Sequence, residues 1–171
     1  FLANQAMNYL VSGKPPRRAG NAHPNIQPQD VFRARDGYLV LAVGNDEQFV
    51  RFCGVLGRPD LAQDERFKTK ALRSANYPTL HHVIAQHVRS APRAQWIERL
   101  TAHEVACAPV YELAEVFGDP IVQSLGMLKT FTDPWGKTQR TVGSGIDFSD
   151  TPAVEPTRAP LLGEHNREIL A

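Results

Sequence analysis

Residues 20–49 hold much of the structural information in this chain: Gly20-Asn21-Ala22-His23-Pro24-Asn25-Ile26-Gln27-Pro28, then Asp36-Gly37-Tyr38-Leu39-Val40-Leu41-Ala42-Val43-Gly44-Asn45-Asp46-Glu47-Gln48-Phe49. The prolines of the first stretch hold the backbone extended and remove hydrogen-bond donors, so it is expected to be a connector. In the second stretch, Asp36-Gly37 lies between two runs rich in strand-forming residues. This pattern predicts a hairpin with a type I′ turn, because Asp-Gly accepts positive φ at both central positions. The predicted order is loop, hairpin, helix.

The rest of the chain is predicted to be mostly helical. Asn45 or Asp46 is expected to cap a helix that ends at Gly57, and apolar residues fall inside it at helical spacing: Phe49, Phe52, Cys53 and Leu56. Further helices are expected near residues 78–88, behind Pro92 and at 111–117, with Ala108-Pro109-Val110 as an interruption between the last two. A second hairpin is predicted from residues 127–132 and 138–142.

These elements predict an α+β fold: a small antiparallel sheet built from hairpins with packed helices, preceded by a linker helix and followed by an extended returning tail. Three parts are expected. Residues 1–28 form a linker helix and connector, residues 29–155 a small α+β domain, and residues 156–171 the tail. Prolines and glycines concentrate in residues 13–28 and 151–163, which is typical of linkers.

The composition is that of an ordinary soluble domain. The 171 residues are 42% hydrophobic and 22% charged, with a formal net charge of +1. Such a charge creates no strong field for nucleic acid or anionic lipid, so neither is expected as a partner. The longest apolar run, residues 38–43, is far shorter than the ~20 residues that cross a bilayer, and the chain is expected in the cytoplasm. Cys53 and Cys107 form no metal-binding spacing, and no metal site is expected.

Histidines are the obvious candidates for chemistry, but their spacing supports none strongly. His23 has no carboxylate or nucleophile beside it in the loop, as a general base would need. His81, His82 and His87 lie on one predicted helix without the ligand pair of an H-E-x-x-H motif, and a solvated helix face explains them better. Lys14, Arg17 and Arg18 form a basic cluster that either meets a phosphate or belongs to a solvated linker.

Motifs along the whole chain resemble the class III (family III) CoA-transferases. Besides the opening stretch they are Tyr9-Leu10-Val11-Ser12-Gly13-Lys14-Pro15-Pro16-Arg17-Arg18, Arg66-Phe67 with Arg73 and Asn76, and Arg158-Ala159-Pro160-Leu161-Leu162-Gly163-Glu164-His165-Asn166. The resemblance implies an enzyme that moves CoA between carboxylic acids through an acyl-aspartyl intermediate. It also implies a coenzyme A thioester and a carboxylic acid as substrates, no tightly bound cofactor, and an intertwined homodimer.

In the formyl-CoA branch of that family the matching loop is glycine-rich and closes over the reactive intermediate. The resemblance therefore places an active-site loop, here called the 20–27 loop, at the mouth of the active site: Gly20, Asn21, Ala22, His23, Pro24, Asn25, Ile26 and Gln27. This chain carries His23-Pro24-Asn25-Ile26 where the family has glycines, so its loop is expected to be stiffer. The alternative is a plain linker with a turn at Gly20-Asn21.

No catalytic residue is expected in this chain, because the family's nucleophilic aspartate lies in an N-terminal Rossmann-like domain that no segment here matches. The opening on Phe1 without methionine suggests a C-terminal portion of a longer enzyme, inactive alone. Two other interpretations stay open. One is a fragment of an α-methylacyl-CoA racemase, which the transferase-like G-N-D-x-Q-F of Gly44 to Phe49 argues against. The other is a stand-alone, non-catalytic CoA-binding or interaction module.

Overall fold

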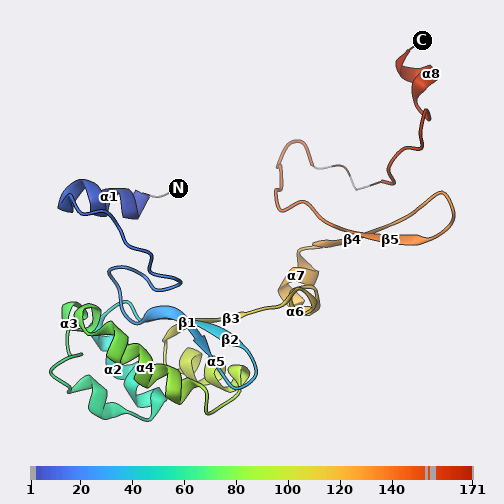
Figure 1. Cartoon of the computed structure of the whole chain (residues 1–171). Helices are drawn as coiled ribbons and strands as arrows, with labels where there is room; N and C mark the ends of the chain where they lie inside the picture. The colour runs from blue at the N-terminus through green and yellow to red at the C-terminus, as the bar shows by residue number, and fades with distance from the viewer. Residues whose placement is uncertain (1–2, 153, 155–156, 171) are drawn as a thin grey trace. The chain divides into compact units, whose positions relative to one another are not determined.

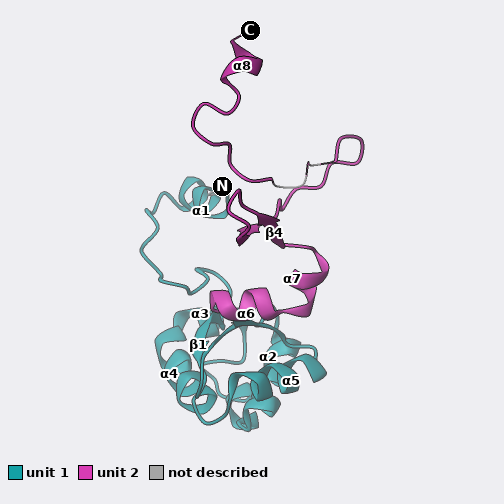
Figure 2. Ribbon diagram, turned by 90° about the vertical axis from the view of Figure 1, so that its right-hand side faces the viewer, with its two compact units in different colours: residues 1–110 teal, residues 111–171 magenta. Residues whose placement is uncertain are grey.

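The computed structural model describes residues 3–152, 154 and 157–170. The chain divides into two compact units, Phe1–Val110 and Tyr111–Ala171, which Figure 2 shows in teal and magenta. This boundary falls within residues 29–155, for which a single small domain is predicted. Whether the two units form one domain in a whole protein stays a prediction. Each unit is described by itself below.

Unit 1 is built on a three-stranded antiparallel sheet with the order β1-β2-β3, formed by β1 (Gln29–Arg33), β2 (Tyr38–Ala42) and β3 (Ala106–Val110). The predicted first hairpin is confirmed. The third strand was not expected, because Pro109 interrupts a strand pattern as well as a helix pattern. Proline is tolerated in β3 because β3 is an edge strand, where one side of the backbone needs no ladder partner.

The predicted type I′ turn is wrong. Arg33 pairs with Tyr38, so four residues connect the strands, and neither Asp36 nor Gly37 has positive φ. Asp36 instead turns its carboxylate to a distant helix: Oδ1 accepts a 2.7 Å hydrogen bond from the backbone N–H of Arg93. This bond caps the first residue of α5 (Arg93–Ala102), whose own N-cap residue, Pro92, makes no side-chain cap. The Asp36 side chain thus caps a helix that is distant in the sequence, and no type I′ turn forms.

Helices cover one face of this sheet, as Figure 1 shows for α2 (Asp46–Leu56), α4 (Tyr77–Val88) and α5. The short elements η1 (Pro59–Ala62) and α3 (Lys70–Ala75) connect them. Side chains alternate along β2, with Leu39 and Leu41 buried and Tyr38 and Val40 exposed, so β2 is covered on one face only in unit 1. The fully buried large apolar side chains include Phe32, Leu39, Leu41, Phe49, Phe52, Phe67, Leu80, Ile84, Leu100 and Val105.

The termini of α2 follow the sequence. Asn45, not Asp46, is the N-cap: its Oδ1 accepts a 2.8 Å hydrogen bond from the N–H of Gln48. Asp46 and Glu47 then lie in the first turn, where the helix dipole favours negative charge. Gly57 ends the helix with φ of 75°, a left-handed conformation that glycine adopts without steric cost.

Unit 2 contains α6 (Leu113–Gly118), α7 (Pro120–Ser124), a two-stranded sheet of β4 (Leu128–Thr132) and β5 (Thr138–Val142), and α8 (Asn166–Ile169). The second predicted hairpin is confirmed, and with it the α+β class. The two hairpins, however, enter separate sheets rather than one. None of the described residues of unit 2 is buried within this chain.

The two ends of the chain carry exposed apolar side chains. Helix α1 (Ala3–Ser12) has no buried residue, and Leu10 is 71% exposed. In the tail, Leu161, Leu162 and Ile169 are also exposed, while Phe1 and Leu2 lie outside the described residues. In the part of the chain that the structure describes, no helix is long and apolar enough to cross a membrane.

Two valines on helices provide a matched test of this core. Val88 on α4 is 3% exposed, whereas Val50 on α2 is 55% exposed. We predict that Val88→Ala lowers the free energy of unfolding by about 1–3 kcal/mol, because it removes buried methyl groups and leaves a void. Val50→Ala should change it by less than about 0.5 kcal/mol. Chemical denaturation of both variants checks this, and equal losses would contradict the placement of the core.

Candidate functional site

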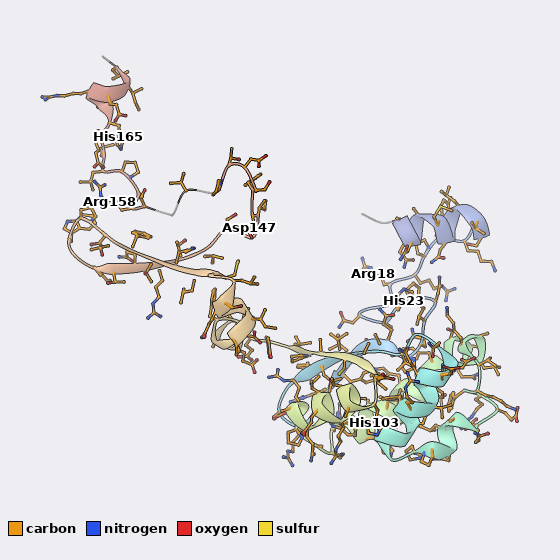
Figure 3. The ribbon with its side chains drawn as sticks, turned by 180° about the vertical axis from the view of Figure 1, so that it is seen from behind. Arg18, His23, His103, Asp147, Arg158 and His165 are labelled. Atoms are coloured by element: carbon orange, nitrogen blue, oxygen red, sulfur yellow. The ribbon has the colours of Figure 1, made fainter. Side chains whose placement is uncertain are left out.

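The 20–27 loop connects α1 to β1 and has a defined internal structure. A turn closes at its start, where the N–H of Ala22 donates to the carbonyl oxygen of Ala19 (3.2 Å) and Gly20 has φ of 63°. Farther on, the N–H of His23 donates to the carbonyl oxygen of Gln29 (2.9 Å). Figure 3 shows His23 on this loop. The predicted turn at Gly20-Asn21 is thus present, and a closed, hydrogen-bonded segment follows it.

His23 shapes the loop through its ring. Nδ1 accepts hydrogen bonds from the backbone N–H groups of Asn25 and Ile26, each 3.1 Å long. A nitrogen that accepts two N–H groups carries no proton, so this geometry assigns the ring proton of the neutral imidazole to Nε2. The two backbone N–H groups occupy Nδ1 as their acceptor. The arrangement makes His23 a structural acceptor.

Gln27 fixes the C-terminal end of the loop through its buried side chain. Its side chain is buried, 4% exposed for the residue, and bridges two backbone groups. Nε2 donates to the carbonyl oxygen of His23, and Oε1 accepts from the N–H of Gln29 (3.1 Å). The peptide bond from Gln27 to Pro28 is cis, and the carbonyl oxygen of Pro28 accepts from the N–H of Val43 (2.9 Å). The loop therefore ends against the sheet.

Arg73 on α3 anchors this end of the loop. Its side chain is fully buried and donates three hydrogen bonds: from Nε to the carbonyl oxygen of Gln27 (2.9 Å), from Nη1 to that of Phe67 (3.1 Å), and from Nη2 to Oδ1 of Asp46 (2.7 Å). The guanidinium carbon also lies 4.5 Å from the centre of the Phe49 ring. One side chain thus joins the loop, the start of α2 and the segment before α3.

Sequence reasoning did not predict this role for Arg73. In the sequence the residue stands out only as one of several that carry a family resemblance. An arginine in a short polar helix is expected to be exposed, because arginine is almost never fully buried unless it is paired. The available signal was weak: Asp46 lies beside the N-cap of α2, and Arg66-Phe67 precedes Arg73, but nothing local shows that they meet.

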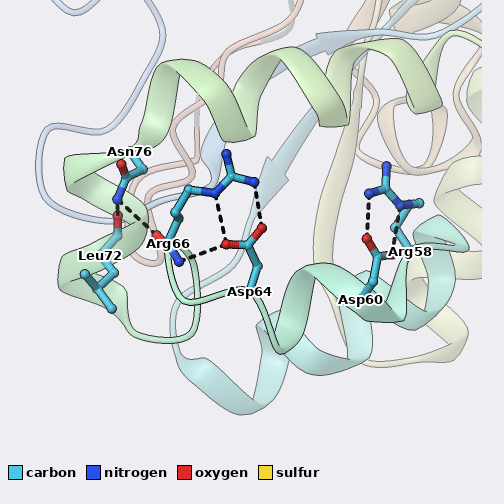
Figure 4. A network of polar contacts seen from close by, with 6 residues as sticks. All are labelled: Arg58, Asp60, Asp64, Arg66, Leu72 and Asn76. Carbon is cyan, nitrogen blue, oxygen red and sulfur yellow. Dashed lines mark hydrogen bonds and ion pairs between the residues drawn. The ribbon is translucent and has the colours of Figure 1, made fainter.

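A second set of polar contacts lies nearby on the surface (Figure 4). Arg58 pairs with Asp60 (2.6 Å), and Arg66 pairs with Asp64 (2.7 Å). The hydrogen bond from Arg66 lowers the pKa of Asp64 to about 2, with a further contribution from the backbone N–H of Arg66. The side-chain amide of Asn76 donates to the carbonyl oxygens of Arg66 and Leu72. The contacts of Arg66 and Asn76 fix the segment before α3, and the Arg58–Asp60 pair lies at the start of η1.

The remaining candidates do not assemble into a site. His81 stacks on Phe32 at 5.1 Å between ring centres, His82 contacts Gln86, and His87 contacts the carbonyl oxygen of Val83. No metal-binding cluster occurs among the described residues. Burial, followed by the hydrogen bond to Asp30, raises the pKa of Tyr77. Lys14, Arg17 and Arg18 are exposed.

The cysteines are free thiols. Cys53 is buried, and this burial raises its pKa to about 12, so it is unreactive as a nucleophile. Cys107 is only partly buried, and burial raises its pKa too.

Comparison with known proteins identifies the family. A sequence model of CoA-transferase family III matches residues 1–166. The chain belongs to CoA-transferase family III.

Relatives with assigned names support this membership. The chain is 43% identical to a succinate–glutarate CoA-transferase of Agrobacterium fabrum, and the match covers 99% of this chain and 42% of that protein. It is 31% identical to a succinyl-CoA:glutarate CoA-transferase of Mus musculus, again over 99% of this chain and 39% of the relative. A crystal structure of a CAIB/BAIF family protein from Brucella suis matches with a TM-score of 0.82 and 40% identity, over 99% of this chain and 43% of that one. The chain thus spans about two fifths of the length of these family III relatives.

The role of His23 as a hydrogen-bond acceptor can be tested with two variants, one that removes the acceptor and one that keeps an acceptor but has no basic ring. Asn can offer a side-chain oxygen to the N–H two residues on, as Nδ1 of His23 does, but it cannot act as a base. We predict that His23→Ala raises hydrogen exchange at the amides of Asn25 and Ile26 several-fold, because both lose their acceptor, while His23→Asn keeps most of the protection. Exchange measured by NMR on the folded chain checks this; protection in His23→Ala that stays at the wild-type level would show that Nδ1 does not hold the loop.

Proposed function

We propose that the whole protein to which this chain contributes is a CoA-transferase, which moves CoA between two carboxylic acids through an acyl-aspartyl intermediate. Family membership over residues 1–166, which include most of both units, carries the proposal. The named relatives described above are CoA-transferases, which favours this reading over a racemase or a non-catalytic module. The nucleophilic aspartate is proposed to come from a part of the enzyme outside this chain.

Succinyl-CoA is proposed as the donor and a dicarboxylic acid as the acceptor. The names of the relatives support this choice: succinate with glutarate at 43% identity, succinyl-CoA with glutarate at 31% identity, and succinyl-CoA with mesaconate at 35% identity in Haloarcula hispanica. Succinate, glutarate and mesaconate are all dicarboxylic acids of four or five carbons. A second carboxylate distinguishes them from simple fatty acids.

The 20–27 loop is proposed to form one wall of the active-site mouth and to keep water from the activated acyl group. Its internal hydrogen bonds support a preformed wall better than a mobile lid. Exposed residues such as Pro24 and Asn25 are available to meet substrate, whereas Gln27 is buried and holds the shape. The stiffness expected from His23-Pro24-Asn25-Ile26 fits this arrangement.

The exposed apolar residues at both ends of the chain are proposed to be covered in the complete enzyme, by its large domain or by the second subunit of a homodimer. The tail is proposed to return to the large domain. Local contacts give the tail an ordered shape for this return, because Arg158 pairs with Glu164, which also accepts a 2.7 Å hydrogen bond from the N–H of Leu161. A cytoplasmic location completes the proposal.

The activity is tested with the full-length protein. Incubated with succinyl-CoA and glutarate, it should form glutaryl-CoA and release succinate in equal amounts. The isolated 171-residue chain should form none, because it lacks the nucleophile. Mass spectrometry of the CoA thioesters checks both. Turnover by the isolated chain, lost on mutation of one of its own carboxylates, would refute the assignment of the nucleophile; no transfer by the full-length protein with any of the acids named above would refute the activity.

The loop is tested by shortening it in the full-length enzyme. Replacing residues 23–26 by two glycines should raise the amount of free acid released relative to the acyl-CoA formed, because water then reaches an activated carbonyl. An unchanged ratio at normal thermal stability would reduce the loop to a linker.

A further inference from the structure

We propose that Arg73 and Asp46 are positioning residues for the reaction: together they hold the Gln27 end of the 20–27 loop in place, and the water exclusion of the active site depends on this anchor. The inference rests on the proposed function. Neither residue belongs to the loop, and neither is expected to touch substrate.

The geometry of Arg73 carries the first step. A buried guanidinium is stable only when its charge is paired and its N–H groups are bonded. Arg73 meets this requirement with acceptors from three separate segments, and one of them is the backbone carbonyl oxygen of Gln27. Movement of the loop away from α3 would leave Nε without its acceptor in a site closed to water. The cost of that loss opposes opening of the loop.

The second step is the connection from Gln27 to the rest of the loop. The backbone of Gln27 is held by Arg73, and its side chain binds the carbonyl oxygen of His23 and the N–H of Gln29. His23 in turn binds the N–H groups of Asn25 and Ile26. A continuous series of hydrogen bonds therefore runs from the buried guanidinium to the exposed part of the loop.

Asp46 supplies the charge that orients Arg73. Its Oδ1 lies 2.7 Å from Nη2, yet its side chain is 56% exposed, so the pair has one buried and one accessible member. Removal of the Asp46 carboxylate opens no cavity in the core, but it leaves the buried charge of Arg73 without its counter-ion and so weakens the orientation of the guanidinium. Glu47 lies in the same first turn of α2 and has the same charge, but it is not a partner of Arg73.

The chain offers matched controls for both residues. Arg66, like Arg73, pairs with an aspartate and lies over a phenylalanine ring, 4.9 Å from the centre of Phe67, but it is exposed and its side chain pairs with Asp64, away from the loop (Figure 4). Arg66→Lys therefore controls for Arg73→Lys, since lysine keeps the charge and loses the planar set of donors. Glu47→Ala controls for Asp46→Ala, since both remove one negative charge from the start of α2.

The test uses the full-length protein and two readouts. The first is the ratio of hydrolysed to transferred acyl group, which is a property of each folded active molecule and does not depend on the fraction that is unfolded. The second is hydrogen exchange at the loop amides. We expect Arg73→Lys and Asp46→Ala to raise both several-fold, and Arg66→Lys and Glu47→Ala to leave both near the wild-type values. If Arg73→Lys fails to fold, Asp46→Ala with its control decides.

Each outcome separates the anchor from the activity. Loop exchange that does not change in Asp46→Ala and Arg73→Lys overturns the anchor. Faster exchange with an unchanged ratio shows that the anchor exists but does not protect the reaction, which overturns the positioning role. Absence of transfer in the wild type overturns the proposed function instead, and exchange alone then decides whether the anchor exists.

Discussion

A charged side chain sealed from solvent constrains everything around it. In unit 1 this side chain is Arg73, which must keep its acceptors because a buried unpaired guanidinium would cost more than most single contacts contribute. Its partners come from the connector before β1, the start of α2 and the segment before α3. Since these segments also meet the apolar core at Phe49 and Phe67, packing and polar bonding fix the same positions.

The sheet of unit 1 shows how packing follows from strand alternation. Leu39 and Leu41 point into the helices, while Tyr38 and Val40 on the same strand are exposed. Val110 on β3 pairs with Tyr38 and is exposed as well. The helix-covered face forms the core of this unit, so the loop that enters β1 begins from a rigid base. In a CoA-transferase of family III, we propose that this rigid base holds the 20–27 loop in place as a wall of the active site.

Unit 2 depends on different interactions. Its hairpin and short helices bury no residue within this chain, and its order comes from local hydrogen bonds. Asp133 is an example: Oδ1 accepts from the N–H groups of Trp135 and Lys137 and closes the turn between β4 and β5. In the tail, the hydrogen bonds from Arg158 lower the pKa of Glu164 to about 2. Such segments hold a local shape and leave their apolar side chains outward.

Features that depend on neighbouring residues along the chain could be predicted from the sequence. Helical periodicity between a cap at Asn45 or Asp46 and a stop at Gly57 predicted α2, and apolar runs on either side of turn residues predicted both hairpins and the α+β class, because caps and periodicity act over a few residues. The motifs spread over the chain also gave the family. Tertiary structure decided what depends on distant partners. Asp36 caps α5 instead of forming a type I′ turn, Pro109 lies in an edge strand, and Arg73 is buried among acceptors up to 46 positions away. Local propensity carries no information on such contacts, because the residues that form them come together only when the chain folds.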